Sequence, residues 1–395
     1  MKHFKENILF KKSKYRIIRY IKSRILVILF YVFRIIPIDN KKIVVDSYRG
    51  MGYYGNPKYI TEALINKKVD CKIIWLSKSY KAITSEKIKV IPFHTIRSVF
   101  HLCTANIWVD NCRKDYWTRK RNKQFYIQTW HGGIGPKCVE KDAIGKVSNE
   151  YILGAINDSK MANLFISNSD FATDSFRKSF WYNGNILEKG LPRNDILINE
   201  NKETSEKIRK KLKIPNNTKI ILYAPTFRKD FNVVHHQKNF SQLINFLEST
   251  TDAKWTILLH LHPNLWEKSN LLMYTNKFIN ANCFDIQELI IASDILITDY
   301  SSIMFDFALT DKPVFLYTFD LDAYKGDRNF CVDFNSLPFS HANTLENLIK
   351  EFKNFNYKKY VNKLRDVFNE FGIKETGKAS DEIVKIIIDK ISEEL

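Results

Sequence analysis

Short apolar runs alternate with amphipathic stretches along most of the chain. In the first half, these runs fall at residues 43–45, 73–76, 107–109 and 125–127. Each run has the length of a strand, and continuous hydrophobicity is typical of strands that are buried on both faces of a parallel sheet. The pattern therefore predicts strands and helices in alternation around such a sheet.

A second series of apolar runs begins after a polar stretch, rich in Lys and Glu, at residues 198–217. These runs fall at residues 220–223, 255–259, 295–298 and 313–316. We therefore predict an α/β protein with a first domain over residues 41–205 and a second over residues 206–395. The last part of the second domain, residues 376–395, has the pattern of a terminal amphipathic helix.

The N-terminus is strongly basic. Residues 1–24 contain nine Lys or Arg and one acid, Glu6, and they lead into an apolar run at residues 25–33. This run is too short to cross a bilayer, which needs about 20 apolar residues, and no small-residue cleavage site of a signal peptide follows it. We predict that residues 1–40 form a basic amphipathic segment on an anionic membrane surface. The alternative is a helix that docks on the core of the protein itself.

The composition narrows the class of protein. The 395-residue chain is 45% hydrophobic and 14% aromatic, which excludes disorder and a small disulfide scaffold. Its net charge of +19 calls for an anionic partner. Much of this charge lies in the first 24 residues and no nucleic-acid module is apparent, so we predict no nucleic-acid partner. The six cysteines form no C-x-x-C pair, which predicts reduced cytosolic thiols rather than a zinc site or disulfides.

The clearest local signal follows the apolar run that ends at Thr298. Asp299, Tyr300, Ser301 and Ser302 come next, before the apolar start of a helix. The N–H groups of a helix start attract phosphate, and ligands of open α/β sheets bind at the carboxyl ends of strands. We therefore predict an anion site here. The alternative, ordinary N-capping, accounts for only one of these polar residues.

A second cluster, residues 128–135, directly follows the apolar run at residues 125–127 and contains His131 and three glycines. Glycines let the backbone approach a ligand closely, and an imidazole at a strand exit can remove a proton from a hydroxyl. The pattern therefore makes His131 a candidate catalytic base. The alternative is an inert loop histidine.

Other polar groups occupy similar loop positions. His260 and His262 form an H-x-H pair whose rings point to opposite faces if the strand continues, which disfavours zinc and favours one ring in a cleft. Polar segments at residues 190–195 and 224–228 also follow or precede apolar runs. Either segment alone is compatible with a plain turn.

Several of these segments belong to one ordered series of motifs. The series is Asp46-Ser47-Tyr48-Arg49-Gly50, Asn56-Pro57, Thr129-Trp130-His131-Gly132, Gly190-Leu191-Pro192-Arg193-Asn194-Asp195, Ala224-Pro225-Thr226-Phe227-Arg228, His262-Pro263, Thr298-Asp299-Tyr300-Ser301-Ser302, and Tyr317 to Tyr324 with Arg328 and Phe330. The series resembles the CDP-glycerol:glycerophosphotransferases, which make teichoic acids and related capsular polymers. The resemblance covers roughly residues 43–335 and implies a GT-B-like fold, with two Rossmann-like domains that face each other across a cleft.

The resemblance also implies roles for the residues. The second domain would bind a CDP-activated alditol phosphate and the first would present the acceptor. His131 would be the general base, and His262 would contact the donor phosphates. The substrate-binding candidates are Arg193, Asn194, Thr226, Arg228, Thr298, Asp299, Ser301, Ser302 and Arg328. Two positions depart from the family pattern: many members have Thr at the place of Gly133 and Arg at that of His260.

The implied reaction transfers an alditol phosphate, glycerol phosphate first, to a hydroxyl of a lipid-linked saccharide acceptor and releases CMP. We expect no cofactor and a metal-independent site, with Mg²⁺ held by isolated acids as the alternative. A CDP-ribitol donor and a nucleotide-sugar glycosyltransferase of the same fold remain as alternatives. The absence of a second large module favours a primase or short-chain transferase over a polymerase. We expect a peripheral protein on the cytoplasmic face of the cell membrane, and the sequence carries no signal for its oligomeric state.

Overall fold

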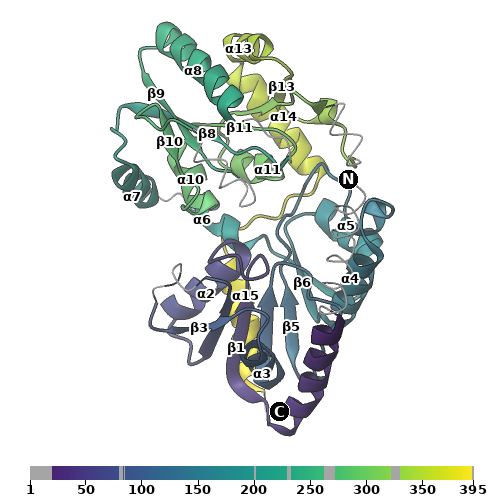
Figure 1. Cartoon of the computed structure of the whole chain (residues 1–395). Coiled ribbons are helices and arrows are strands. Elements are labelled where there is room, and N and C mark those ends of the chain that lie inside the picture. Colours follow the sequence, from purple (N-terminus) through teal and green to yellow (C-terminus); the bar gives the residue numbers. More distant parts are fainter. Residues whose placement is uncertain are drawn as a thin grey trace, which may run out of the picture.

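Two parallel sheets, one in each half of the molecule, form its core (Figure 1). The computed structural model describes residues 20–79, 83, 85–199, 202–228, 233–261, 272–321 and 330–393, with the side chains of residues 233–236 left out. Seven strands pair in the order β3-β2-β1-β4-β5-β6-β7, and six pair in the order β10-β9-β8-β11-β12-β13. All neighbouring strands run parallel. The predicted α/β class with two parallel sheets is confirmed.

The first half contains the seven-stranded sheet. Its elements are η1 (Phe33–Ile35), β1 (Asp39–Asp46), α2 (Gly55–Asn66), β2 (Lys72–Ser77), β3 (Ile88–Pro92), α3 (Ile96–Thr104), β4 (Ala105–Asp110), β5 (Phe125–Gln128), η3 (Glu140–Ala143), α4 (Asn149–Met161), β6 (Leu164–Ser167), α5 (Asp170–Ser179), β7 (Asn185–Glu188) and η4 (Pro192–Asn194). Two helices, α6 (Asp195–Ile198) and α7 (Lys202–Leu212), follow on the way to the second half.

The second half contains the six-stranded sheet. Its elements are β8 (Thr218–Tyr223), α8 (Val233–Thr250), β9 (Lys254–Leu259), β10 (Phe278–Asn280), α10 (Ile286–Ala292), β11 (Ile295–Thr298), α11 (Ile303–Ala308), β12 (Val314–Tyr317), η6 (Phe334–Ser336), β13 (Ser340–Ala342), α13 (Leu345–Lys353) and α14 (Tyr357–Glu370). The last helix, α15 (Ala379–Ser392), ends the described chain.

Strand β1 illustrates why the apolar runs become central strands. Ile43 and Val45 point to one face of the sheet, where they join a buried cluster, and Val44 points to the other face, where it joins a different one. Side chains alternate across a strand, so a strand that is covered on both faces needs consecutive apolar residues.

The N-terminal helix, residues 20–32, covers one face of the first sheet. Leu26 and Phe30 pack in the same cluster as Val44. The opposite side of the helix leaves apolar side chains exposed, among them Ile21 and Ile28 at 52% and 60%. Docking on the core therefore accounts for one face of this helix only. Among the described residues, no helix combines the length and the hydrophobicity that crossing a membrane requires.

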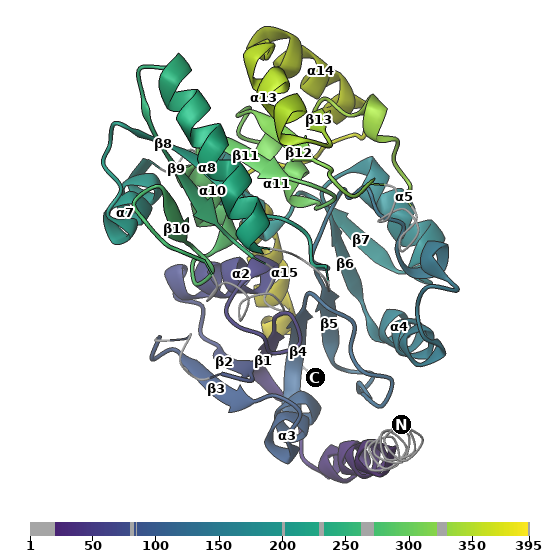
Figure 2. The same cartoon turned by 45° about the horizontal axis from the view of Figure 1, so that its top comes forward.

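The terminal helix α15 returns to the first half. Its residues Ile383, Val384 and Ile387 are buried in the cluster that contains Ile43 and Val45, on the face opposite the N-terminal helix. Figures 1 and 2 both show α15 beside the strands of the first sheet. The helix was predicted, but the prediction that it belongs to the second domain was wrong. An amphipathic pattern indicates that one face of a helix is buried, but it does not indicate which sheet covers that face.

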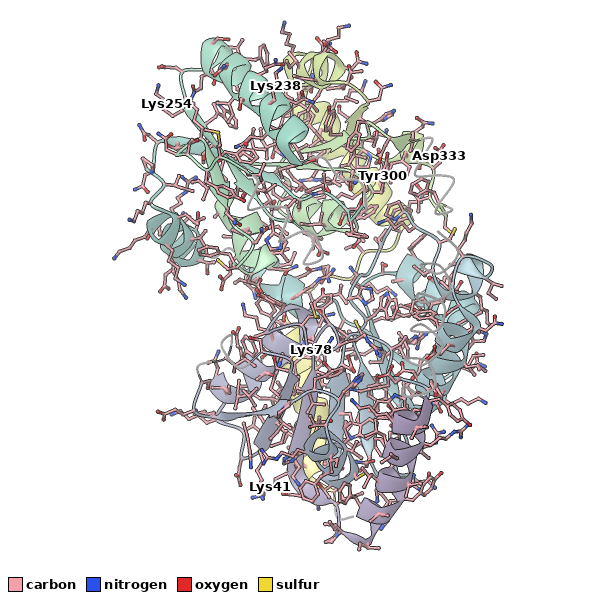
Figure 3. All side chains as sticks on the ribbon, viewed as in Figure 1. Lys41, Lys78, Lys238, Lys254, Tyr300 and Asp333 are labelled. Atoms are coloured by element: carbon pink, nitrogen blue, oxygen red, sulfur yellow. A yellow bond between two sulfur atoms is a disulfide. The ribbon has the colours of Figure 1, made fainter. Side chains whose placement is uncertain are left out.

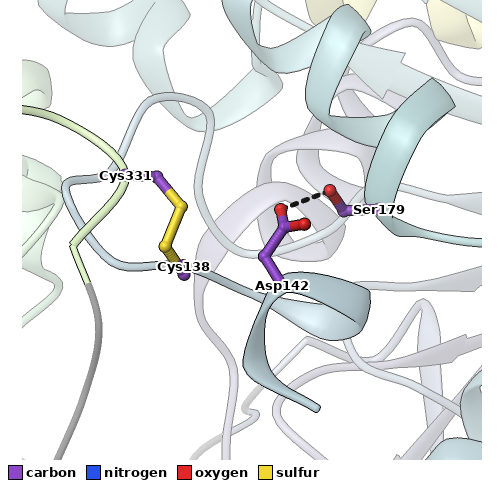
Figure 4. The surroundings of a disulfide bond; sticks show 4 residues. All are labelled: Cys138, Asp142, Ser179 and Cys331. Carbon is purple, nitrogen blue, oxygen red and sulfur yellow. Dashed lines mark hydrogen bonds between the residues drawn. A yellow bond between two sulfur atoms is a disulfide. The ribbon is translucent and has the colours of Figure 1, made fainter.

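Two of the six cysteines are joined. Cys138 of the first half and Cys331 of the second form a disulfide (Figure 4). The prediction of reduced thiols throughout was therefore wrong for this pair. The two cysteines are separated by 193 residues, and nothing in their local sequence marks them as neighbours.

Candidate active site

A large cavity of about 1720 Å³ lies between the two halves. Its walls come from loops at the carboxyl ends of strands in both sheets: Tyr48, Cys112 and His131 in the first, Ala224 and Ser301 in the second. The described lining contains six Lys or Arg and three Asp. Lys78 and Tyr300, both in the lining, mark the two sides in Figure 3. This basic surplus suits a phosphorylated ligand.

His131 is presented to this cavity by the loop that follows β5. The backbone carbonyl of Asn111 lies 2.9 Å from Nδ1 of the ring. A carbonyl can only accept, so Nδ1 carries the proton and Nε2 of the neutral ring has its lone pair available. The described residues offer Nε2 no hydrogen-bond partner. This is the tautomer that a general base needs.

The surroundings keep this ring neutral. Burial lowers the pKa of His131 to about 4; the hydrogen bond to Asn111 raises it, while the positive charges of Arg193 and Arg113 lower it further. The imidazole is thus unprotonated over the whole physiological range.

Buried hydrogen bonds hold the backbone before His131 in an uncommon conformation. Trp130 has φ of 51°, which is rare for a bulky residue and costs on the order of 1–3 kcal/mol. The side-chain amide of Asn56 donates to the carbonyls of Thr129 and Trp130 at 3.2 and 3.1 Å. The side chain of Gln128 accepts from the N–H of Trp130 at 2.9 Å. The loop is therefore fixed by its neighbours.

The side chain of Asn168 leaves no room for a Cβ atom at Gly133. A Cβ atom at this position would overlap with the side-chain amide of Asn168. Since a threonine could not be accommodated without moving Asn168, the departure from the family pattern at Gly133 has a local reason.

The glycines of this loop also bring the two halves together. A Cβ atom on Gly132 would lie 3.4 Å from Oγ of Ser302, and one on Gly135 would lie 3.5 Å from its Cβ. The loop of the predicted base therefore lies directly against the predicted anion site of the other half.

Ser301 and Ser302 line the cavity just before α11. The Ser301 hydroxyl accepts a long hydrogen bond, 3.4 Å, from the N–H of Ile303. Ser302 makes no side-chain cap to its helix. Both side chains are partly buried, so their hydroxyls are within reach of a ligand in the cavity.

The other polar residues of the same segment are engaged in structural bonds. The Thr298 hydroxyl is fully buried and donates to the carbonyl of Ala224 at 2.7 Å. The Asp299 carboxylate accepts from the N–H of Thr226 at 3.0 Å and from Arg228 at 2.6 Å. Neither Thr298 nor Asp299 is part of the described lining, whereas Thr226 and Arg228 are.

Arg228 lies between two carboxylates. In addition to Asp299, Asp320 pairs with its guanidinium, with 2.9 Å between Oδ1 and Nη2. The guanidinium also lies over the ring of Tyr300, 5.3 Å from its centroid. Arg228 lines the cavity with much of its charge already balanced.

Arg193 connects the two walls. Its guanidinium donates to the backbone carbonyl of His131 at 2.6 Å and pairs with Asp306 of α11 at 2.8 Å. Asn194 donates to Asp306 at 3.4 Å and to Glu375 at 2.7 Å, and it is not among the described lining residues. Burial raises the pKa of Glu375 to about 7, although the amides of Asn194 and Asn168 oppose this.

His262 and Arg328 lie outside the described residues. His260 lines the cavity, and its ring nitrogen Nδ1 donates to the carbonyl of Ala281 at 3.1 Å. The part of the chain that the structure describes brings no three His, Cys, Asp or Glu side chains together as metal ligands.

Sequence reasoning missed the residues that support the site. Asn111, Asn168 and Asp306 fix His131, Gly133 and Arg193, and they had no assigned role. Lys114 is buried between Asp46 and Asp110, at 3.4 and 2.5 Å, beneath the same loops. Asp46 belongs to the first motif and Asp306 follows the serines, so position in the motifs was the available signal.

Two parallel sheets whose carboxyl ends meet at one cavity define a GT-B-like class of fold. A family model described as CDP-Glycerol:Poly(glycerophosphate) glycerophosphotransferase matches residues 28–389. The chain belongs to this family and is an enzyme of the CDP-glycerol glycerophosphotransferase type. The resemblance inferred from the motifs is confirmed.

Relatives by sequence include polymerases of two alditol phosphates. A teichoic acid poly(glycerol phosphate) polymerase of Bacillus spizizenii (strain W23) is 31% identical over 382 residues, which cover 92% of this chain and 96% of the relative. One of Bacillus subtilis (strain 168) is 30% identical over 366 residues, 89% of this chain, which spans only 49% of that relative. A poly(ribitol-phosphate) polymerase of Bacillus spizizenii is 26% identical over 391 residues, 95% of this chain and 61% of the relative.

Solved structures agree with this assignment. The wall teichoic acid polymerase TagF matches with a TM-score of 0.83 and 29% identity, over 97% of this chain and 98% of TagF. A TagF variant soaked with CDPG matches over 97% of both chains, also with a TM-score of 0.83. The fold of this chain is therefore TagF-like.

Proposed function

We propose that this enzyme transfers glycerol phosphate from CDP-glycerol to a hydroxyl of a membrane-linked acceptor in teichoic acid or capsular polymer synthesis. The observation that carries the proposal is the juxtaposition of His131 and Ser302. The loop of a neutral histidine lies against Ser302 at the start of α11, and His131, Ser301 and Ser302 line one basic cavity. The relatives and the TagF variant soaked with CDPG support the donor class.

In the proposed reaction, the acceptor hydroxyl attacks the β-phosphorus of the donor, and CMP leaves. Nε2 of His131 takes the hydroxyl proton as the bond to phosphorus forms. The hydroxyls of Ser301 and Ser302 donate to the pyrophosphate, together with His262 and Arg328, whose roles stay predictions. Such a transfer depends chiefly on positioning and electrostatic stabilisation.

In this proposal, the other candidate residues either line the cavity or support its wall. Thr226 and Arg228 lie in the cavity wall beside the donor, whereas Thr298 and Asp299 hold that wall in place. Arg193, which lines the cavity, and Asn194, which does not, act through their bonds to His131 and Asp306.

The finer identity of the donor is tested by product release. The enzyme is incubated with a synthetic lipid-linked saccharide and, separately, CDP-glycerol, CDP-ribitol or a UDP-sugar, and the release of CMP or UDP is measured. We expect CMP from CDP-glycerol at the highest kcat/KM. Higher kcat/KM with CDP-ribitol would make the enzyme a ribitolphosphotransferase, and release of UDP alone would make it a glycosyltransferase. Mass spectrometry of the products separates a primase, which adds one unit, from a polymerase.

We also propose peripheral attachment to the cytoplasmic face of the cell membrane through the exposed side of the N-terminal helix. Its apolar side chains would enter the interface while neighbouring cations meet anionic lipid. The double variant Ile21→Glu with Ile28→Glu is compared with Met273→Glu, which changes an apolar residue that is 77% exposed in the second half. Only the helix variant should lose binding to vesicles that contain anionic lipid, and unchanged sedimentation would refute the attachment.

A further inference from the structure

The disulfide between Cys138 and Cys331 joins the two halves beside the cavity. Cys138 follows His131 by seven residues, and both cysteines belong to the cavity lining. The surrounding backbone is also paired: the N–H of Cys331 donates to the carbonyl of Pro136 at 2.8 Å, and Lys137 forms an antiparallel bridge with Phe330. The Cα atoms lie 5.1 Å apart, within the ordinary range for a disulfide.

The other side-chain links between the halves that the described residues make are noncovalent. Lys58 and Tyr59 of α2 contact Asp285, which precedes α10, at 3.2 and 2.9 Å, and Arg193 pairs with Asp306. Links of this kind can break and re-form while a substrate enters or a product leaves. A covalent bond across the cleft cannot, and it fixes the loop that carries His131 to the second half.

We propose that Cys138 and Cys331 are a reversible thiol–disulfide modification site, which clamps the cleft when oxidised and releases it when reduced. The chemical class of its reactant is a dithiol in the reducing direction and a small disulfide in the oxidising direction. Cys331 is exposed and Cys138 is partly buried, so we assign the attack to Cys331.

The exchange balances without any other reactant. A thiolate of the dithiol attacks Sγ of Cys331, the bond between the two protein sulfurs breaks, and Cys138 leaves as a thiolate that takes up a proton. The second thiol of the dithiol then displaces Cys331, which also becomes a thiol. The protein gains two electrons and two protons, and the dithiol is oxidised to its disulfide.

The consequence for the enzyme concerns exchange of ligands rather than the chemical step. In the proposed function, a CDP-alditol must enter and CMP must leave in every cycle. With the clamp closed, opening of the cleft is restricted, so that dissociation of CMP slows and limits kcat. We expect CMP to dissociate at least about tenfold more slowly from the oxidised enzyme, and a dithiol to restore the faster rate.

The experiment uses the full chain, oxidised with a small disulfide or reduced with a dithiol. Mass spectrometry of a nonreduced digest first measures the Cys138–Cys331 peptide pair, and stopped-flow measurements then give the dissociation rate of CMP. Cys138→Ser and Cys331→Ser should both remove the redox response. The matched control is Cys283→Ser, because Cys283 is exposed and free and is absent from the described cavity lining, and it should keep the full response.

Two results would overturn the proposal: no disulfide-linked peptide after oxidation, or equal dissociation rates in the two forms. Hydrogen exchange needs no ligand, so it tests the clamp independently of the proposed function. Amides at residues 132–139 and 330–334 should exchange more slowly in the oxidised protein whatever its substrate. If exchange at these residues is the same in both forms, the clamp is refuted even where CMP binds.

Discussion

The two walls of the cavity use their polar residues differently. In the first wall, one functional side chain, His131, is held by several buried groups that come from distant parts of the sequence, such as Asn111 and Asn56. In the second wall, neighbouring residues have different surroundings. Thr298 and Asp299 form hydrogen bonds within the protein, whereas Ser301 and Ser302 line the cavity. This motif is thus divided between residues that line the cavity and residues that hold its wall, and burial separates the two.

The largest expected effect lies in the first wall. His131→Ala should lower kcat by about 10² to 10⁴-fold, because the acceptor proton loses its base. The Kd for the CDP donor should stay nearly unchanged, since His131 is proposed to contact the acceptor. Single-turnover kinetics and isothermal titration measure the two quantities. A folded variant with near-normal kcat would remove His131 from the mechanism.

The ion pair between Arg193 and Asp306, which links the two walls, should contribute to the free energy of unfolding. Asp306→Ala leaves the buried guanidinium of Arg193 without its carboxylate, and breaking such a pair costs roughly 3–5 kcal/mol. Asp306→Asn keeps an acceptor for Arg193 and should cost less. Urea unfolding measures both variants, and a change in the free energy of unfolding below about 1 kcal/mol for Asp306→Ala would contradict the role of the pair.

The pH profile tests the environment of the base. His131 must be neutral to act, so kcat/KM falls as the pH drops through its pKa in the free enzyme. Because burial lowers this pKa to about 4, the acid limb should lie near pH 4 rather than near 6.5. The limb is measured with CDP-glycerol over the pH range in which the protein stays folded. An acid limb near pH 6.5 would contradict His131 as the titrating group.

The second wall should respond through donor binding. Ser301→Ala with Ser302→Ala removes two hydroxyl donors to the pyrophosphate, and hydrogen bonds to charged groups contribute about 1.5–3 kcal/mol each. The donor KM should rise at least tenfold, while the backbone N–H groups preserve some binding. Steady-state kinetics with varied CDP-glycerol measures it, and an unchanged KM would count against this site.

The smallest effect is expected from the scaffold part of the same motif. Thr298→Val removes one buried hydrogen bond to Ala224 and should lower the free energy of unfolding by about 1 kcal/mol. The donor KM should stay within about twofold, in contrast to the serine double variant. A KM increase as large as that of the serines would place Thr298 at the ligand after all.

The central strands could be predicted because they are buried on both faces. All eight apolar runs lie in strands β1, β2, β4, β5, β8, β9, β11 and β12, apart from Pro313 at the start of the last run. Strands β3, β6, β7, β10 and β13 were not predicted. β7, at an edge of its sheet, shows why: its burial is only partial, so it lacks a continuous apolar run.

The candidate site was predictable only as far as its residues are adjacent in the sequence. The serines and His131 belong to compact motifs at strand exits, which the periodicity locates. The pairing of Arg193 with Asp306 and the disulfide between Cys138 and Cys331 join residues more than 100 positions apart, so that only the fold brings them together. No local pattern carries that information.

The return of α15 to the first sheet makes the second half an insertion within the first. The chain leaves and re-enters the first half at neighbouring points, where Asn199 donates to the carbonyl of Gly377 at 2.8 Å and Asp195 accepts from the N–H of Ala379 at 2.9 Å. A short linker could therefore replace residues 202–374 and leave a continuous first half with its own cover helix. A chain that is simply cut near residue 205 would instead expose the apolar face on which α15 packs.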